Sequence, residues 1–386
     1  MIATPPTPLD TFRAAVMADH AAQALLAEPF DPAVFEARAI AWAAARGITL
    51  SPQDLAGCGR PDPIGMFRFT AAPRMQDEWP PEGWLPVGFV HGPEPAIQWF
   101  HFAGISPSTP FFEDAVLEAG GRPFNRLFRT ATPLRSLVGR ADLRAPSGLV
   151  FHMSRCGSTL VSQMLGAAPG HVSISETSVL DALIQHPFED PDTHADALRA
   201  LVHAYGRGAG HLFLKLDSWH TRALPLLRRA FPDTPWIFLY RDPVEVLVSQ
   251  LRQRGAQTVP GIVPLDWFGF APEDAHLPER TFIARVLERT CNAVIEHGGG
   301  KGMLVNYAEL PDAFFDRILP HFGLEPEAPA RRAMEIAATR YSKAPTAGFT
   351  ADGDAKQREA DPELRAAADR YVAPVFAELE AARAAT

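Results

Sequence analysis

Short apolar runs alternate with longer amphipathic segments through the second half of the chain. The apolar runs occupy residues 148–153 (GLVFHM), 211–216 (HLFLKL), 236–240 (WIFLY) and 302–305 (GMLV). The segments between them predict helices over residues 159–168, 221–230, 243–253 and 280–297. Continuous apolar strands that alternate with helices are typical of a parallel sheet covered on both faces. We therefore predict an α/β domain over residues 147–386.

The first 140 residues show a different pattern. Residues 10–46 are rich in Ala and Leu and predict two helices, with Pro29 and Pro32 at the break between them. Pro, Trp and Phe then become dense, and residues 96–102 predict a short strand. Residues 111–138 predict one or two helices. We expect a mixed, mainly helical region over residues 1–140. Three roles are open to it: shaping an acceptor pocket, forming a homo-oligomer, or enlarging the fold.

The amino-acid composition limits which kinds of binding partner and which cellular compartment we expect. Hydrophobic residues make up 47% of the chain and charged residues 21%, which is typical of a globular protein. The formal charge of −9 offers no global attraction for nucleic acid, so a bound anion needs a local group of donors. Cys58, Cys156 and Cys291 form no CxxC pair, which argues against a thiolate metal site and favours a reducing cytoplasm. No apolar run reaches the length of about 18 residues that membrane insertion needs.

The segment SRCGSTL follows the first predicted strand and opens its helix. Ligands of such sheets bind at the carboxyl ends of strands. Gly157 lets the backbone approach a ligand, and the first helical turn presents unpaired N–H groups. Ser158 and Thr159 add hydroxyl donors, and Arg155 adds a forked cation suited to phosphate or sulfate. Two interpretations are open: a phosphate loop, or a plain strand-to-helix turn with Ser and Thr as caps.

A second candidate anion site follows the third predicted strand. That strand runs directly into Arg241-Asp242-Pro243, and Ser249 lies eight positions after Arg241 on the predicted helix. Both side chains would reach one anion if this helix packs toward the first loop. The alternative is that Arg241 merely pairs with Asp242.

The two segments together, SRCGSTL and RDP…S, resemble the cytosolic and Golgi sulfotransferase superfamily over roughly residues 147–350. The resemblance implies a P-loop-NTPase-like parallel sheet flanked by helices. It also implies transfer of a sulfuryl group from 3′-phosphoadenosine 5′-phosphosulfate (PAPS) to an acceptor hydroxyl or amine, with no metal. By the same resemblance, Arg241 and Ser249 hold the 3′-phosphate. The 5′-phosphosulfate is held by the first loop: Arg155, Cys156, Gly157, Ser158, Thr159 and Leu160.

Two further segments are similar to family elements. Tyr307, in NYAEL, stands where the family's Tyr-Glu-x-Leu element places a Tyr beside the adenine nucleotide. Lys343, in YSKA, suits the basic C-terminal loop that closes over the 3′-phosphate in the family. Leu160 stands where many cytosolic members have a tryptophan that stacks on adenine.

The general base has two candidates. Glu176, in SISET, looks like the Gly-Glu-Glu region of the tyrosylprotein branch, where a Glu is the base. Lys215 and His220 lie near the Lys-x-His of the cytosolic branch, but here four residues separate them. We rank Glu176 first and His220 second as the base, and expect Lys215 to contact the sulfuryl group. The alternatives are capping or surface roles for Glu176 and His220, and for Asp217 either a helix cap or a partner of Lys215.

Other classes of function remain to be weighed. A P-loop phosphotransferase that uses ATP and Mg²⁺ needs the Gly-Lys of GxxxxGK[ST], where this chain has Cys156-Gly157. A nucleotide-binding protein without catalysis would keep the anion sites but tolerate loss of Glu176. A metal-dependent oxygenase needs an HxD/E triad, and the only match is His194-Ala195-Asp196. The long segment 253–275 is either a lid or a packing insertion.

Overall fold

The structure is a computed structural model that describes residues 6–56, 69, 71, 73–341, 344–348 and 353–385. The chain folds into two compact units. The first comprises Met1–Pro107, Phe111–Ala141 and Ser178–Leu183. The second comprises Ser108–Pro110, Asp142–Thr177 and Ile184–Thr386. Each unit has its own sheet and its own core.

The second unit is built on a five-stranded parallel sheet in the order β6-β7-β5-β8-β9. The predicted α/β architecture is therefore confirmed. The chain leaves the central strand toward β6 on one side and later crosses to β8 on the other, so β5 marks the topological switch point where such sheets bind ligands. The strands are β5 (Gly148–His152), β6 (His171–Ser175), β7 (His211–Lys215), β8 (Trp236–Tyr240) and β9 (Gly302–Asn306).

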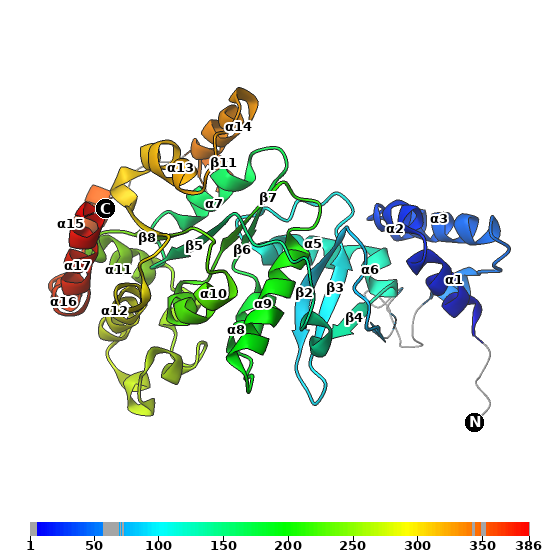
Figure 1. Ribbon diagram of the computed structural model, residues 1–386, viewed down its shortest axis with the longest axis horizontal. Coiled ribbons are helices and arrows are strands. Elements are labelled where there is room, and N and C mark those ends of the chain that lie inside the picture. Colours follow the sequence, from blue (N-terminus) through cyan, green and yellow to red (C-terminus); the bar gives the residue numbers. More distant parts are fainter. Residues whose placement is uncertain are drawn as a thin grey trace. The chain divides into compact units, whose positions relative to one another are not determined.

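Helices cover both faces of this sheet (Figure 1). One face carries α7 (Ser158–Gly166), against which α14 (Ala328–Ala338) packs. The other face carries α9 (Pro191–Tyr205), α10 (Leu224–Ala230), α11 (Pro243–Arg252) and α12 (Glu279–His297). Every residue of β5 and β8 is buried, as expected for central strands covered on both sides. The unit also contains α13 (Leu319–His321), α15 (Gly353–Glu359), α16 (Pro362–Ala367), α17 (Ala373–Ala384), β10 (Arg340–Tyr341) and β11 (Ala344–Gly348), and α8 (Ser178–Gln185) begins in the first unit.

Strand β6 is absent from the four strands that the apolar runs predict. Its sequence, HVSIS, alternates polar and apolar residues, so no continuous apolar run marks it as a buried strand. The hydroxyls of Ser173 and Ser175 lie 2.8 and 2.7 Å from that of Ser162 on α7. This buried hydroxyl cluster satisfies polar groups that would otherwise be costly inside the protein.

The first unit is mainly helical but also holds a four-stranded sheet, β1-β4-β3-β2. The strand expected at residues 96–102 is β3. The prediction of two helices over residues 10–46 is wrong, because Asp19 caps an extra helix by accepting the Ala22 N–H at 3.0 Å. The elements are α1 (Pro8–Met17), α2 (His20–Ala27), α3 (Pro32–Ala44), α4 (Pro52–Leu55), β1 (Arg74–Met75), β2 (Trp84–Val90), β3 (Ala96–His101), α5 (Phe112–Gly121), α6 (Pro123–Leu127) and β4 (Thr130–Pro133).

Part of the segment 253–275 packs into the second unit, which agrees with the packing interpretation. Phe268 and Phe270 are buried against Phe282 of α12. The indole of Trp267 donates a hydrogen bond of 3.0 Å to the Trp219 carbonyl. Within the part of the chain that the structure describes, no helix is both long and apolar enough to span a bilayer.

Candidate active site

The candidate residues gather at one edge of the second unit's sheet. Because the five strands are parallel, their carboxyl ends share that edge. Each strand delivers one candidate there: Glu176 after β6, Lys215 at the end of β7, the 154–160 loop after β5, Arg241 after β8 and Tyr307 after β9. The edge therefore brings together most of the residues that the sequence singles out. Lys343 lies outside the described residues.

The loop after β5 has an unusual backbone. Ser154, Arg155 and Gly157 have φ values of 77°, 53° and 86°, all in the left-handed region. For the two residues that are not glycine, such a conformation costs on the order of 1–3 kcal/mol each, and it persists only where neighbours hold it. Residues held in this way tend to cluster at functional sites.

Three contacts hold this turn. The Ser154 N–H donates to His152 Nδ1 at 3.0 Å, and Gln250 Nε2 donates to Ser154 Oγ at 3.0 Å. The Arg155 guanidinium donates to the Gln253 carbonyl at 2.5 Å. The loop is thus fixed by its own strand and by the end of α11 before any ligand binds.

Helix α7 begins at Ser158 with Gly157 at its N-cap, and no side chain caps it. Its first N–H groups and the positive end of its dipole therefore suit an anion. The thiol of Cys156 is buried and donates to the Leu239 carbonyl at 3.0 Å, and burial raises its pKa to about 12. Leu160 is buried as well. The side chains of these two residues are therefore enclosed, and only their backbone is suited to contact a ligand.

Arg241 is buried and lies on an aromatic ring. Its guanidinium carbon is 4.0 Å from the centre of the Tyr307 ring. Its partner is not Asp242, the alternative that the sequence left open, but Glu245, whose Oε2 accepts from Nε at 2.5 Å. Ser249 lies one turn further along and donates to the Glu245 carbonyl at 2.7 Å.

Tyr307 contacts both candidate anion-binding elements. A β-carbon built on Gly157 would lie 2.8 Å from Tyr307 Cδ2, so the 154–160 loop lies directly against this ring. Arg241 covers the same ring. Residues that follow β5 and β8, far apart in sequence, therefore converge on the side chain that follows β9.

Glu176 lies in a cluster of three titratable side chains at the ends of β5, β6 and β7. The Lys215 ammonium pairs with Glu176 Oε1, and His152 Nε2 lies 3.2 Å from the same oxygen. The strand register explains the cluster, because Lys215 pairs with Ser175 on one side and Val150 on the other. The side chains of Lys215, His152 and Glu176 are 0%, 5% and 21% exposed, so the carboxylate is the member that reaches solvent.

The cluster keeps Glu176 ionised. Burial alone would raise the pKa of Glu176, but the Lys215 charge and His152 outweigh it and hold that pKa well below the usual 4.5. Burial lowers the pKa of His152 below 6.5, so its ring is neutral near pH 7. His152 is the site residue that sequence reasoning missed. Its only signal is a polar residue at the end of an apolar run.

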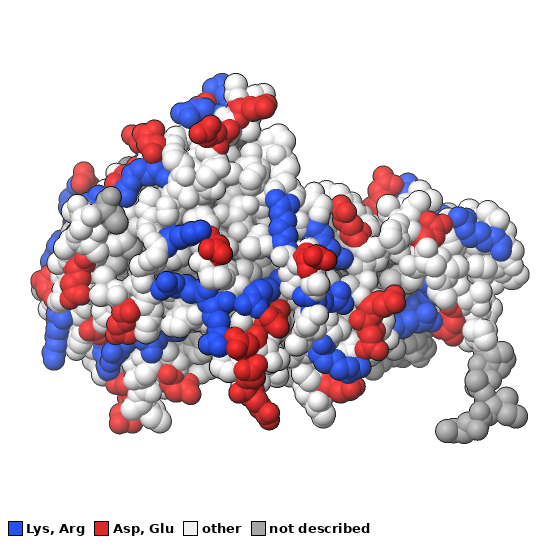
Figure 2. Space-filling model, in the orientation of Figure 1, with Lys and Arg blue, Asp and Glu red and all other residues white. Residues whose placement is uncertain are grey.

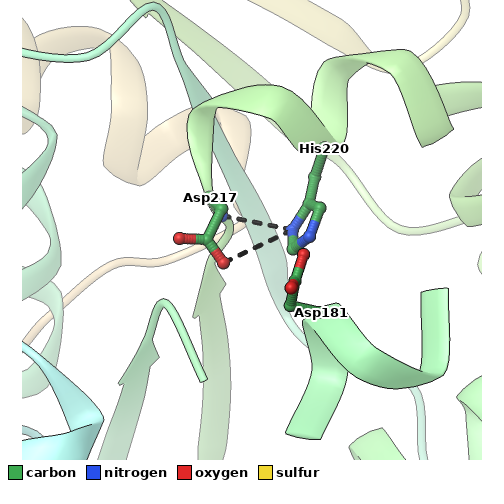
Figure 3. A group of neighbouring side chains, drawn as sticks. All are labelled: Asp181, Asp217 and His220. Atoms are coloured by element: carbon green, nitrogen blue, oxygen red, sulfur yellow. Dashed lines mark hydrogen bonds and ion pairs between the residues drawn. The ribbon is translucent and has the colours of Figure 1, made fainter. Parts of the chain in front are cut away.

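His220 is buried, not a surface residue as one interpretation held. Its Nδ1 accepts the Asp217 N–H at 3.2 Å and lies 3.9 Å from Asp217 Oδ2 (Figure 3). Asp217 in turn caps the 3₁₀ turn Ser218–Ala223. One ring nitrogen of His220 is thus committed to capping the turn after β7, so Glu176 is the stronger candidate base.

Comparison with known proteins decides the family. Residues 149–328 match the profile of the sulfotransferase family, from the central strand to the start of α14. This part of the chain belongs to the sulfotransferase family. The second unit is accordingly the sulfotransferase unit, and sulfuryl transfer is its class of reaction. No curated protein matches the chain.

Several solved sulfotransferases are similar to the chain at low identity. The sulfotransferase STF9 from Mycobacterium avium is 17% identical, with 62% of this chain and 76% of that chain covered and a TM-score of 0.38. STF1 from Mycobacterium tuberculosis H37Rv is 16% identical, with coverage of 50% and 71% and a TM-score of 0.34. The sulfotransferase domain from the curacin biosynthetic pathway is 15% identical, with coverage of 52% and 80% and a TM-score of 0.37.

Proposed function

We propose that the sulfotransferase unit binds PAPS and transfers its sulfuryl group to a hydroxyl or amine of an acceptor. The observation that carries this proposal is the shared contact of Gly157 and Arg241 with Tyr307. The N–H groups of the 154–160 loop, with Arg155, Ser158 and Thr159, hold the 5′-phosphosulfate. Arg241 and Ser249 hold the 3′-phosphate, and Tyr307 lies between the two anions.

The chemistry needs few groups from the protein. The acceptor oxygen or nitrogen attacks the sulfur in line, the bond between sulfur and the 5′-phosphate oxygen breaks, and 3′-phosphoadenosine 5′-phosphate (PAP) leaves. Glu176, held as a carboxylate, takes the acceptor proton. The loop N–H groups stabilise the charge that develops on the transferring group and on the leaving phosphate, and the buried Lys215 ammonium holds Glu176 in place.

Glu245 sets a condition on binding. It neutralises Arg241 in the structure, so the 3′-phosphate must replace the carboxylate as the partner of the guanidinium. A phosphate offers more charge and more acceptor oxygens than one carboxylate, which favours the exchange.

Charge on the protein surface agrees with local capture of the donor. On the face shown in Figure 2, Lys and Arg side chains lie interspersed with Asp and Glu. With a net charge of −9, the protein attracts a nucleotide through the donors of the site rather than through a broad basic field.

A transfer assay tests the proposal against the phosphotransferase alternative. The protein is incubated with radiolabelled PAPS and a panel of phenols, alcohols, sugars and amines, and in parallel with γ-labelled ATP and Mg²⁺. We expect label transfer from PAPS that chelators do not abolish, and none from ATP. Transfer from ATP alone would overturn the proposal. PAP binding without transfer to any acceptor or to water would point instead to a nucleotide-binding protein without catalysis.

A further inference from the structure

His152 ends the central strand and lies between the phosphate loop and the Glu176 cluster. It is 4% exposed and comes directly before the turn that begins at Met153. Its two ring nitrogens face different parts of the site. Nδ1 accepts the N–H of Ser154, and Nε2 lies 3.2 Å from Glu176 Oε1.

The first contact fixes where the ring proton sits. A neutral imidazole carries one proton, and the nitrogen that accepts a hydrogen bond cannot carry it. Because Nδ1 accepts from Ser154, the proton of neutral His152 is on Nε2. The Nε2–H approaches Glu176 without full hydrogen-bond alignment, and this buried nitrogen makes no well-aligned hydrogen bond among the described residues.

We propose that His152 is a positioning residue that couples the phosphate loop to the base. Through Nδ1 it holds Ser154 in its left-handed conformation, which aligns the loop N–H groups for the donor. Through Nε2–H it joins Lys215 on Oε1 of Glu176, which leaves Oε2 to receive the acceptor proton. This inference rests on the proposed function, since it takes the loop as the donor site and Glu176 as the base.

Two substitutions separate the two contacts. In His152→Asn the short amide oxygen replaces Nδ1 and still accepts the Ser154 N–H, but nothing reaches Glu176. In His152→Gln the longer amide keeps a donor toward Glu176 but loses the acceptor for Ser154. A matched control is His297→Asn, since His297 lies in the last turn of α12 with a side chain 41% exposed.

The variants are compared by titration with PAP and by transfer of label from saturating PAPS to the best acceptor of the screen, or to water. We expect His152→Gln to raise the Kd for PAP roughly five- to tenfold, the effect of one lost hydrogen bond, and to lower turnover less than His152→Asn does. We expect His152→Asn to keep the Kd within about twofold, in line with its retained bond, and to lower turnover roughly 10- to 100-fold. His297→Asn should change neither quantity.

The experiment distinguishes failure of the role of His152 from failure of the proposed function. If the wild-type protein does not bind PAP, the proposed function falls. If it binds PAP but the Asn and Gln variants lose affinity and turnover in parallel, or lose neither, only the role of His152 falls. Should both variants fail to fold, ¹⁵N NMR of the wild-type histidine rings decides. The Nε2–H tautomer is expected for His152 at neutral pH, and the Nδ1–H tautomer would overturn the proposal.

Discussion

The guanidinium of Arg241 covers the ring of Tyr307, with 4.0 Å between the guanidinium carbon and the ring centre. The 154–160 loop, which follows another strand, reaches that ring through Gly157. Arg241 is meanwhile paired with Glu245 on its own helix. The proposed 3′-phosphate site is therefore built before ligand binds, with a carboxylate in the place of the phosphate as partner of the arginine.

Arg241→Ala should weaken PAP binding by about 2–5 kcal/mol, because a buried cation that pairs with phosphate is lost. Glu245→Gln should instead strengthen it several-fold, since Arg241 no longer has to exchange a charged partner. Glu335→Gln is the matched control, because Arg331 and Glu335 form a pair with the same spacing on α14. Calorimetric titration with PAP measures all three. Weaker binding by Glu245→Gln would show that Glu245 holds Arg241 in place rather than competing for it.

Gly157→Ala should abolish tight PAP binding. The added carbon meets Tyr307 at 2.8 Å, and φ is 86°. Gly261→Ala is the control for the cost of the left-handed backbone without a steric clash. Gly261 has the same φ of 86°, and nothing lies within 4 Å of an added β-carbon. We expect both variants to lose about 1–2 kcal/mol of stability from the left-handed conformation. Only Gly157→Ala should lose PAP affinity, by at least roughly tenfold. The reason is the clash with Tyr307, since overpacking costs about 1–3 kcal/mol. Equal PAP affinity in the two variants would separate the loop from the nucleotide site.

Glu176→Gln should lower turnover by about 10²–10⁴-fold with PAP affinity kept, because the amide cannot take a proton. Glu189→Gln, at an exposed position, is the control. The lowered pKa of Glu176 also predicts how stability depends on pH. The carboxylate contributes stability in full above about pH 4.5, the unfolded value, and that contribution is lost as pH falls toward the lower folded-state pKa. Turnover of Glu176→Gln equal to wild type would remove Glu176 as base.

The C-terminal helix α17 should stabilise the sheet edge through Glu380. The Tyr240 hydroxyl donates to this carboxylate, as does Asn306 Nδ2 at 3.0 Å. Hydrogen bonding to Arg383, opposed by burial and aided by Tyr240, lowers the pKa of Glu380 to about 2. Glu380→Gln should therefore lower Tm at neutral pH, and its difference from wild type should shrink as pH falls from about 4.5 toward 2. Thermal melts against Glu378→Gln, at an exposed position on the same helix, provide the test. A pH-independent difference would contradict it.

The architecture of the sulfotransferase unit follows from sequence where burial leaves a continuous apolar run. The four predicted strands are β5, β7, β8 and β9. Strand β6 lacks such a run, because Ser173 and Ser175 are buried through hydrogen bonds to Ser162. In the first unit, β4 lies in a region predicted to be helical, and its sequence TATP is too short for periodicity to show. The hydrophobic pattern of a segment does not predict a strand whose burial depends on side chains elsewhere in the chain.

The same limit applies to the site. The candidate anion-binding residues can be recognised from their residue types and their positions after strands. The partner of Arg241 cannot be recognised in this way. Asp242 is adjacent in sequence, whereas Glu245, one helical turn away, is adjacent in space. The joint contact of Lys215 and His152 with Glu176 depends on the order of three strands, which no single segment encodes.

Recognition of the 3′-phosphate is the central claim, and titration of the wild-type protein with PAP and with ADP tests it most directly. The two nucleotides share an adenosine and a 5′-linked anion but differ in the 3′-phosphate. A charge-assisted contact is worth about 1.5–3 kcal/mol, so PAP should bind roughly 10- to 150-fold more tightly than ADP, and Arg241→Ala should remove most of that difference. Equal affinity for the two nucleotides would contradict the account.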